Sequence, residues 1–474
     1  MWILLLLVTC WAILAFLINR QRQALLIITF LATGGFQLLP VHWFWSPVLL
    51  VKPYDYAYAA MGAVFLLRVR ELAQLLAQER MARLALVYMG FLLLVLLASV
   101  AVFSYSPVQA FQSARVFFWP AFLLLFLLVE RSELERFVKT LFPIVVVLCL
   151  LYLLQPITGK TIINPSGEYY NPYVGSTDMK RYLSTPDFLI GFLLLAYYRL
   201  CSYQDKSMWA RWGHLVAFIL FCSVQIVSFT RSAIVGTGLA LLYLSKRLVH
   251  PVLLGLFIAS LLTSVAIGYS TTTLVENRVD DSVKDISAML DGRFLNRDAA
   301  KDGTLNFRIA HFSERLTYVF DKIELWPMGV GFIHEDSDVA QNLGFKIGLK
   351  NVFTGRIIQV DSGDIAWSVV IIKTGLVGLL LLLTFLGASF VAVGSSQQAY
   401  VVVFRGTLIY FIVTSFFSSN LVAPGYMFPL MLFLALALKS KNDASPAPKP
   451  RGRLQPFQYP GSVNQRPVKQ RGHL

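Results

Sequence analysis

Long runs of apolar residues, separated by short polar gaps, make up most of this chain. A helix needs about 20 largely apolar residues to cross a bilayer, and about 13 runs fit that description. Only helices and closed barrels satisfy their backbone hydrogen bonds in lipid, so the pattern predicts an all-α, polytopic membrane helix bundle. The predicted spans are 2–18, 24–39, 48–67, 84–103, 114–129, 137–155, 187–200, 213–229, 232–245, 251–268, 364–392, 400–417 and 424–438.

One long hydrophilic segment, 269–363, divides the predicted spans into two groups. The first group lies in 1–268, together with an outer loop at 156–186 that is rich in Pro, Gly and Tyr. The second group lies in 364–438. The tail 439–474 is basic and Pro-rich and has little to bury, so we expect it to be disordered.

Inside the long hydrophilic segment, apolar residues recur at three- and four-residue steps over 305–325. This spacing predicts an amphipathic helix that Thr304 can cap and that ends before Pro327. The apolar positions are Leu305, Ile309, Phe312, Leu316, Val319 and Ile323. Arg308, His311 and Arg315 follow the same spacing on a neighbouring stripe. That stripe is either a solvated charged face or a row of groups facing a ligand.

The composition, 57% hydrophobic and 14% charged, is that of an integral membrane protein rather than of a soluble domain. The formal net charge is +15, and Lys and Arg concentrate in alternate short loops and in the tail. The positive-inside rule places those basic loops in the cytosol, so the charge is explained without nucleic acid as a partner. It also predicts that the N-terminus, Arg231 and the segment 269–363 lie on the outer side.

Several arginines stand at the predicted outer boundary of the membrane. Arg231 fills a very short gap between two apolar runs, and Arg308 and Arg315 lie in the long outer segment. An arginine beside a bilayer is costly to bury, and its guanidinium fork matches phosphate oxygens, so these positions indicate an anionic partner. Arg115 and Arg181, at the outer ends of spans, either extend the anionic site or anchor the chain at the interface.

Four stretches, taken in order and with their predicted sidedness, resemble the bacterial O-antigen polymerase and O-antigen ligase superfamily of membrane glycosyltransferases. They are Ser228–Gly236 (SFTRSAIVG), Asn306–Leu316 (NFRIAHFSERL), Trp326–Phe332 (WPMGVGF) and Asp361–Leu380 (DSGDIAWSVVIIKTGLVGLL), with a weaker match at Arg181–Gly191. The ligase branch has a His-Asn-like pair where this chain has Asp361-Ser362. The resemblance therefore favours the polymerase branch or an exopolysaccharide polymerase.

The resemblance implies transfer of a glycan from undecaprenyl diphosphate to a hydroxyl acceptor. The reaction would take place at the outer face of the bacterial inner membrane, with no metal or cofactor. Arg231 matches the family's turn arginine and Arg308 its loop-helix arginine, and the family assigns both to the diphosphate. The partners implied are an undecaprenyl-diphosphate-linked oligosaccharide and membrane lipids, with a chain-length regulator and a flippase acting beside them.

An attacking hydroxyl needs a group that accepts its proton. Asp361, where the outer segment re-enters the membrane, and His311, on the stripe of Arg308, are our candidates. An Asp before a span also commonly caps its helix, so the structural alternative stays open for Asp361. Asp336-Ser337-Asp338 resembles an Asp-x-Asp metal site, but such short matches arise by chance in acidic loops, and we predict no metal.

Two other functions compete with polymerisation. The first is an O-antigen-type ligase that passes the finished glycan to a lipid or protein acceptor. The second is a transporter or flippase for lipid-linked sugars. A transporter predicts charges around a midplane cavity and two related halves of the chain. This sequence instead concentrates its charge at the outer face and shows no repeated halves.

Overall fold

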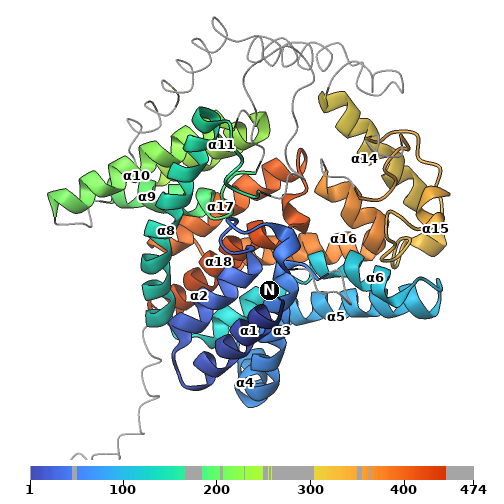
Figure 1. Cartoon of the computed structure of the whole chain (residues 1–474), viewed down its shortest axis with the longest axis horizontal. Helices are drawn as coiled ribbons and strands as arrows, with labels where there is room; N and C mark the ends of the chain where they lie inside the picture. The colour runs from blue at the N-terminus through green and yellow to red at the C-terminus, as the bar shows by residue number, and fades with distance from the viewer. Residues whose placement is uncertain are drawn as a thin grey trace, which may run out of the picture.

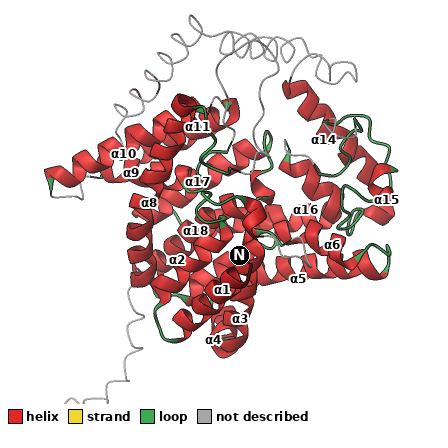
Figure 2. Ribbon diagram, viewed as in Figure 1, coloured by secondary structure: helices red, strands yellow, loops and turns green. Residues whose placement is uncertain are grey.

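The computed structural model describes residues 2–44, 51–165, 184–202, 207–228, 230–248, 255, 258, 304–349, 355–361 and 365–444. In those ranges the regular structure is helical and contains no β-strand, as Figure 2 shows. The all-α prediction is therefore confirmed for this part of the chain. The predicted span 251–268, apart from two residues, lies outside it, and so does Arg181.

The helices follow the predicted order along the chain. The first group is α1 (Trp2–Leu17), α2 (Gln21–Ala32), α3 (Pro53–Leu67), α4 (Val69–Gln78), α5 (Arg80–Ala101), α6 (Pro107–Ala114), α7 (Pro120–Leu128), α8 (Arg131–Thr158), α9 (Leu189–Cys201), α10 (Met208–Val227) and α11 (Arg231–Leu248). The second group is α14 (Thr304–Phe320), α15 (Asp338–Gln341), α16 (Ala366–Ala392), α17 (Ala399–Ser415) and α18 (Pro424–Ala444). Short 3₁₀ turns are η1 (Val41–Phe44), η2 (Arg115–Phe117), η5 (Ile323–Leu325) and η6 (Asn420–Val422).

Four of the described helices, α5, α8, α10 and α16, are long and apolar enough to cross a membrane. A fifth span results if α6–η2 and α7 are taken together. Several other predicted spans coincide with shorter apolar helices. At a rise of about 1.5 Å per residue, a helix such as α2 falls short of a hydrocarbon core about 30 Å thick. The structure thus supports a membrane protein with four or five such helices in its described part.

The predicted single span 114–129 is broken. The stretch Pro107–Phe117 and helix α7 meet at a bend of 59°. Pro120 is the first residue of α7, where its missing N–H and fixed φ are tolerated, whereas inside a helix it would remove a backbone hydrogen bond. Two short helical pieces therefore take the place of one straight helix.

Helices α17 and α18 form the core. Figure 1 shows both in the middle of the molecule, with α9 to α11 on one side and α14 to α16 on the other. Almost every residue of α18 from Met427 to Leu438 is buried, and α17 is buried along most of its length. A helix that is apolar all round must be covered on all sides, and the surrounding helices cover these two.

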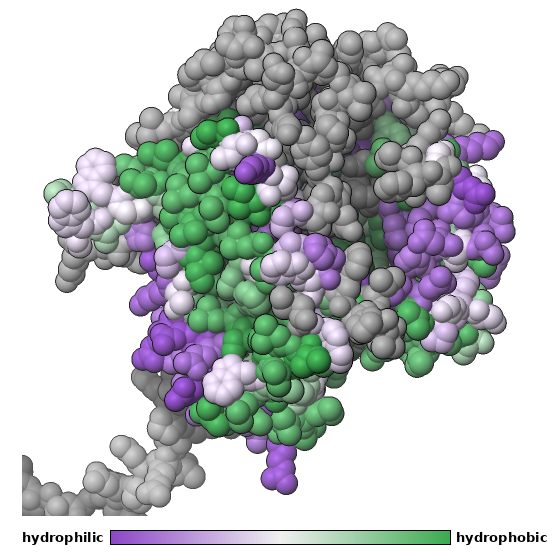
Figure 3. Space-filling view, in the orientation of Figure 1, coloured by the Kyte–Doolittle hydropathy of each residue, from purple (hydrophilic) through white to green (hydrophobic). Residues whose placement is uncertain are grey.

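Helices at the periphery of the bundle expose apolar side chains on its surface. On α5 the exposed large apolar residues are Leu86, Val87, Leu93, Leu94 and Leu97, and Figure 3 shows hydrophobic residues spread over one face of the molecule. An exposed apolar surface of this extent is unfavourable in water and suits contact with lipid chains. The surface therefore agrees with the hydropathy of the spans.

Helix α14 bears out the predicted amphipathic helix of the outer segment. Within the described residues it includes Thr304, which the sequence predicted as its cap, and it ends at Phe320 rather than near 325. A 3₁₀ turn over Ile323–Leu325 follows before Pro327. Helix α14 packs against α16, so the hydrophilic segment contacts the long apolar helix that follows it.

Candidate functional site

Arg231 lies beside the C-terminal end of α17. Two contacts show that helix α11 runs antiparallel to α17. Gly406, in the first half of α17, packs against Leu244, which is near the C-terminal end of α11. Near the start of α11, a methyl group added at Gly236 would lie 3.0 Å from carbon atoms of both Tyr410 and Thr414, in the second half of α17. Arg231 is the first residue of α11. It therefore lies level with the last turn of α17.

Arg308 reaches the same end of α17 from α14. Its guanidinium carbon lies 5.4 Å from the centre of the Phe417 ring, two residues after α17 ends at Ser415. A cation over an aromatic face at this distance is attracted by the ring quadrupole. Two arginines from segments far apart in the chain thus gather around one helix end.

The first residues of α16 complete this region. The N–H of Ala366 donates to the carbonyl of Ser418 at 3.1 Å, and the Trp367 ring lies 5.7 Å from that of Phe416. The N-terminal end of α16 carries the positive end of its dipole. Two arginines and a helix N-terminus make this region favourable for an anion.

His311 is buried and joins α14 to α16. Its Nδ1 lies 3.0 Å from the Ser368 hydroxyl, and its side chain is 1% exposed. Burial, together with the neighbouring Arg315 cation, lowers the pKa of His311 to about 2. A neutral imidazole with so low a pKa is a weak proton acceptor, so the geometry does not favour His311 as the general base.

Arg315 is buried in the outer segment and its donors are occupied. It donates to the carbonyls of His311, Ile347 and Gln359 at 3.2, 2.8 and 3.3 Å. Its guanidinium also lies 4.6 Å from the centre of the Phe345 ring. These contacts tie α14 to the loop that follows. We therefore interpret Arg315 as a structural residue rather than as the predicted diphosphate ligand.

Arg115 in η2 is likewise buried, and it forms an ion pair with Asp55 near the start of α3. Its guanidinium carbon lies 5.5 Å from the centre of the Tyr54 ring. Because Asp55 compensates its charge, Arg115 adds little positive potential for a substrate. Of the arginines predicted to bind diphosphate, Arg308 lies against Phe417 just after α17, and Arg231 begins α11, which packs along the same end of α17.

Asp361 pairs with a buried lysine. Lys373, 2% exposed inside α16, forms an ion pair with the Asp361 carboxylate and donates to the Ser113 hydroxyl at 2.7 Å. The Asp361 side chain itself is 46% exposed. The Asp361 N–H donates to the Glu335 carboxylate at 3.0 Å. Asp361 is thus held from two sides and still reaches solvent.

Two glycine-containing stretches, the loop Trp326–Phe332 and the middle of α16, are joined by backbone hydrogen bonds. The family resemblance includes both of them as separate motifs. Helix α16 is broken at Gly375, which has a φ of 68°. The N–H of Leu376 donates to the carbonyl of Trp326 at 2.9 Å, and the N–H of Val330 donates to the carbonyl of Ile372 at 2.8 Å. The loop Trp326–Phe332 therefore satisfies the backbone groups that the break exposes.

At this junction the two backbones lie so close together that neither Gly329 nor Gly375 has room for a side chain. A methyl group at Gly375 would lie 2.5 Å from the Trp326 oxygen, and one at Gly329 would lie 2.2 Å from the Ile372 oxygen. Gly329 also has a positive φ of 61°. The junction therefore fixes the loop that follows α14 to the middle of α16.

Asp187 is a buried carboxylate that the sequence analysis did not single out. Its Oδ1 accepts from Gln37 Nε2 at 2.9 Å, and its own N–H donates to Gln37 Oε1 at 2.9 Å. Its Oδ2 faces Gly425 in the first turn of α18. The one signal in the sequence is an acidic residue directly before an apolar run, and Gln37 is too distant in sequence to have been linked with it.

No protein-family model matches this chain, and no curated protein matches it. Within the described ranges, no group of three or more His, Cys, Asp and Glu side chains is arranged to hold a metal ion. We take Arg231, Arg308 and the start of α16 as the candidate anion site. The Asp361–Lys373 pair lies further along α16 and is the candidate proton acceptor.

Proposed function

We propose that this protein is an inverting membrane glycosyltransferase that polymerises lipid-diphosphate-linked oligosaccharide repeat units at the outer face of the bacterial inner membrane. One observation carries the proposal. Arg308 contacts Phe417 just after α17, and α11, whose first residue is Arg231, packs along the same end of α17, beside the N-terminal end of α16. Fixed positive groups of this kind match a diphosphate better than a neutral sugar.

The donor in this scheme is the growing glycan on its undecaprenyl diphosphate. The bond between the anomeric carbon and the diphosphate oxygen breaks, and the negative charge on that oxygen grows. Arg231 and Arg308 stabilise the departing diphosphate. A charge-assisted hydrogen bond contributes about 1.5–3 kcal/mol, so the loss of one arginine lowers the rate by roughly ten- to a hundredfold.

The acceptor is the non-reducing-end hydroxyl of a new lipid-linked repeat unit. Its oxygen attacks the anomeric carbon from the face opposite the diphosphate, which inverts the configuration, and its proton passes to a carboxylate. Asp361 is our candidate for that carboxylate. It reaches solvent, whereas His311 is buried with a pKa too low for the role. Lys373 and Glu335 hold Asp361 in position.

Purified protein supplied with defined lipid-linked repeat units tests this proposal. Wild-type protein is expected to give a ladder of glycans on the lipid carrier. Arg231→Ala and Arg308→Ala are expected to lose roughly ten- to a hundredfold in rate. Arg70→Ala on α4 removes the same charge far from the site in sequence and serves as the control. Full chain growth by both site variants contradicts the assignment.

The same assay separates polymerisation from ligation. A ligase leaves lipid-linked repeat units unpolymerised and transfers glycan only when a second acceptor is added. A ladder formed from repeat units alone therefore supports the polymerase, and transfer to an added acceptor without a ladder contradicts it.

A further inference from the structure

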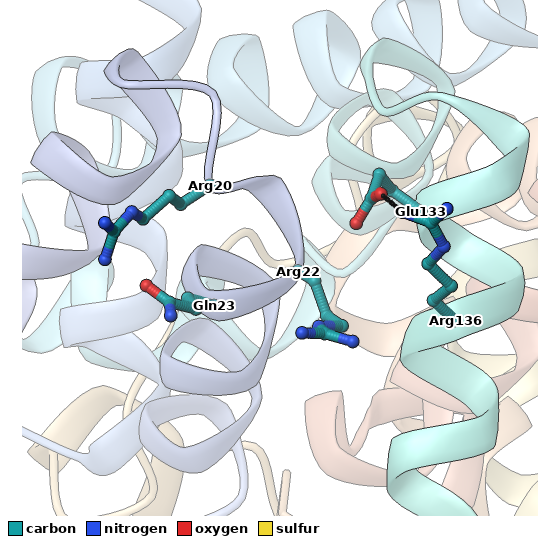
Figure 4. Close-up of a pocket in the computed structure, with 5 residues that line it drawn as sticks. All are labelled: Arg20, Arg22, Gln23, Glu133 and Arg136. Atoms are coloured by element: carbon teal, nitrogen blue, oxygen red, sulfur yellow. Dashed lines mark hydrogen bonds and ion pairs between the residues drawn. The ribbon is translucent and has the colours of Figure 1, made fainter.

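A surface depression between the starts of α2 and α8 is lined by three arginines. Arg20, Arg22 and Gln23 come from the start of α2, and Glu133 and Arg136 come from the first turns of α8 (Figure 4). Glu133 pairs with Arg136 at 2.6 Å. Within the described part of the chain, Arg20 and Arg22 form no ion pair. The depression therefore carries an excess of positive charge.

Two helices begin at this depression. The backbone N–H of Glu130, just before α8, donates to the Gln21 side chain at 3.2 Å and fixes the two helix starts next to each other. Helix α2 has 12 residues and α8 has 28, and the positive ends of both dipoles point to the same place. The dipoles add to the attraction that the guanidinium groups exert on an anion.

An exposed apolar stripe leads directly to the arginines. Exposed apolar side chains occur along the whole of α1, and four of them, the last directly after the helix, recur at steps of four, three and four on one face. They are Leu7, Trp11, Leu14 and Ile18. Arg20 follows two residues later. A ligand that uses both features has an anionic group and long apolar chains.

We infer that this depression binds the headgroup of an anionic phospholipid. The phosphodiester lies between Arg22 and Arg136, with Arg20 at the edge of the depression away from α8 (Figure 4), and the acyl chains follow the stripe on α1. A free phosphate ion would use the arginines but not the stripe, so the stripe favours the lipid. The positive-inside rule places this loop in the cytosol, where the leaflet is rich in anionic lipids. The site does not depend on the proposed glycosyltransferase activity.

Native mass spectrometry of the full chain, released from detergent with lipid, tests the inference. The probe is an equal mixture of phosphatidylglycerol and phosphatidylethanolamine with the same acyl chains. Wild-type protein is expected to retain phosphatidylglycerol preferentially. Arg20→Ala/Arg22→Ala is expected to reduce that preference roughly tenfold, since each arginine near an anionic surface adds to the attraction.

The control is Arg80→Ala/Arg83→Ala, which removes two exposed arginines at the start of α5 and is expected to keep the preference. Equal loss in both double variants shows general attraction to basic loops and overturns the site. Displacement of the lipid by millimolar inorganic phosphate assigns the arginines to a free anion and overturns the lipid. An absence of preference in wild-type protein overturns the inference as well. Chain growth, measured on the same samples, reports separately on the proposed function.

Discussion

At the level of single residues, the proposed diphosphate site requires groups that a guanidinium offers and an ammonium does not. Arg231 starts α11 and Arg308 lies over Phe417, so both occupy fixed positions around the end of α17. A guanidinium presents two parallel donors to phosphate oxygens and stacks on an aromatic ring, whereas lysine supplies a point charge. Replacing an arginine by lysine therefore separates the effect of its charge on the reaction rate from the effect of its hydrogen-bond geometry.

Arg308→Lys keeps the charge and loses the fork. We expect its rate of chain growth to fall by about tenfold, less than for Arg308→Ala, because a charge without bidentate geometry retains part of the interaction. Rates with saturating lipid-linked donor check this. A lysine variant as active as wild type means that the fork is not used.

Asp361 has two roles that a double variant separates. Asp361→Asn leaves Lys373 charged, buried and held by Ser113 alone, so we expect a loss of about 1–3 kcal/mol in stability as well as lost activity. Asp361→Asn/Lys373→Met removes the stranded charge and is expected to regain stability but not chain growth. Thermal unfolding in detergent and the polymerisation assay measure the two effects. Recovery of activity in the double variant assigns Asp361 a structural role only.

His311 makes stability depend on pH. Its pKa is about 2 in the folded protein and about 6.5 in an unfolded chain. Between these values the unfolded state binds the additional proton, so stability falls as the pH drops below 6.5, by up to about 1.4 kcal/mol per pH unit. Thermal unfolding from pH 7.5 to 5.5 checks this against His311→Gln, which has no titrating ring and is expected to show a shallower dependence. Equal slopes show that His311 titrates normally in the folded protein.

At the scale of elements, the contact between the Trp326–Phe332 loop and the break in α16 organises the outer segment. Gly329→Ala places a methyl group against the Ile372 oxygen at a residue with positive φ, and we expect a loss of about 2 kcal/mol or more. Gly387→Ala, also in α16, meets nothing within 4 Å and is expected to be neutral or slightly stabilising. Melting temperatures of the two variants measure the difference. Equal melting temperatures contradict the interlocked junction.

The apolar pattern predicted where helices lie because burial in lipid or in a helical core depends on local composition. It predicted the existence of α14 and placed most of the other long helices within a few positions. It did not predict the breaks at Pro120 and Gly375. The second break depends on backbone groups of a loop about 45 residues earlier in the chain, which no local window contains.

The surroundings of the candidate site residues also depend on contacts between distant parts of the chain, which a local sequence pattern does not predict. The stripe of Arg308, His311 and Arg315 was correctly placed on one helix. Both His311 and Arg315 are buried. The burial of Arg315 depends on carbonyls of Ile347 and Gln359, and the sequence does not show that they fold back onto α14. Arg308 alone of the three stacks on the end of α17.

At the scale of the whole molecule, the basic loops predict one orientation in the membrane. A cysteine placed at Lys322 is expected to react with a membrane-impermeant maleimide in intact cells. One placed at Arg70 is expected to react only after the membrane is opened. The exposed Cys10 is first replaced by alanine to remove background labelling. The reverse pattern puts the candidate site on the cytosolic side and contradicts the proposed reaction.

The central claim is that Arg231 and Arg308 hold one diphosphate together. Chain-growth rates of Arg231→Ala, Arg308→Ala and the double variant form a double-mutant cycle, which measures their coupling. If both contact the same leaving group, the double variant is expected to lie within about tenfold of the weaker single variant. Losses that multiply as independent effects, or a double variant that still extends chains at the wild-type rate, contradict the account.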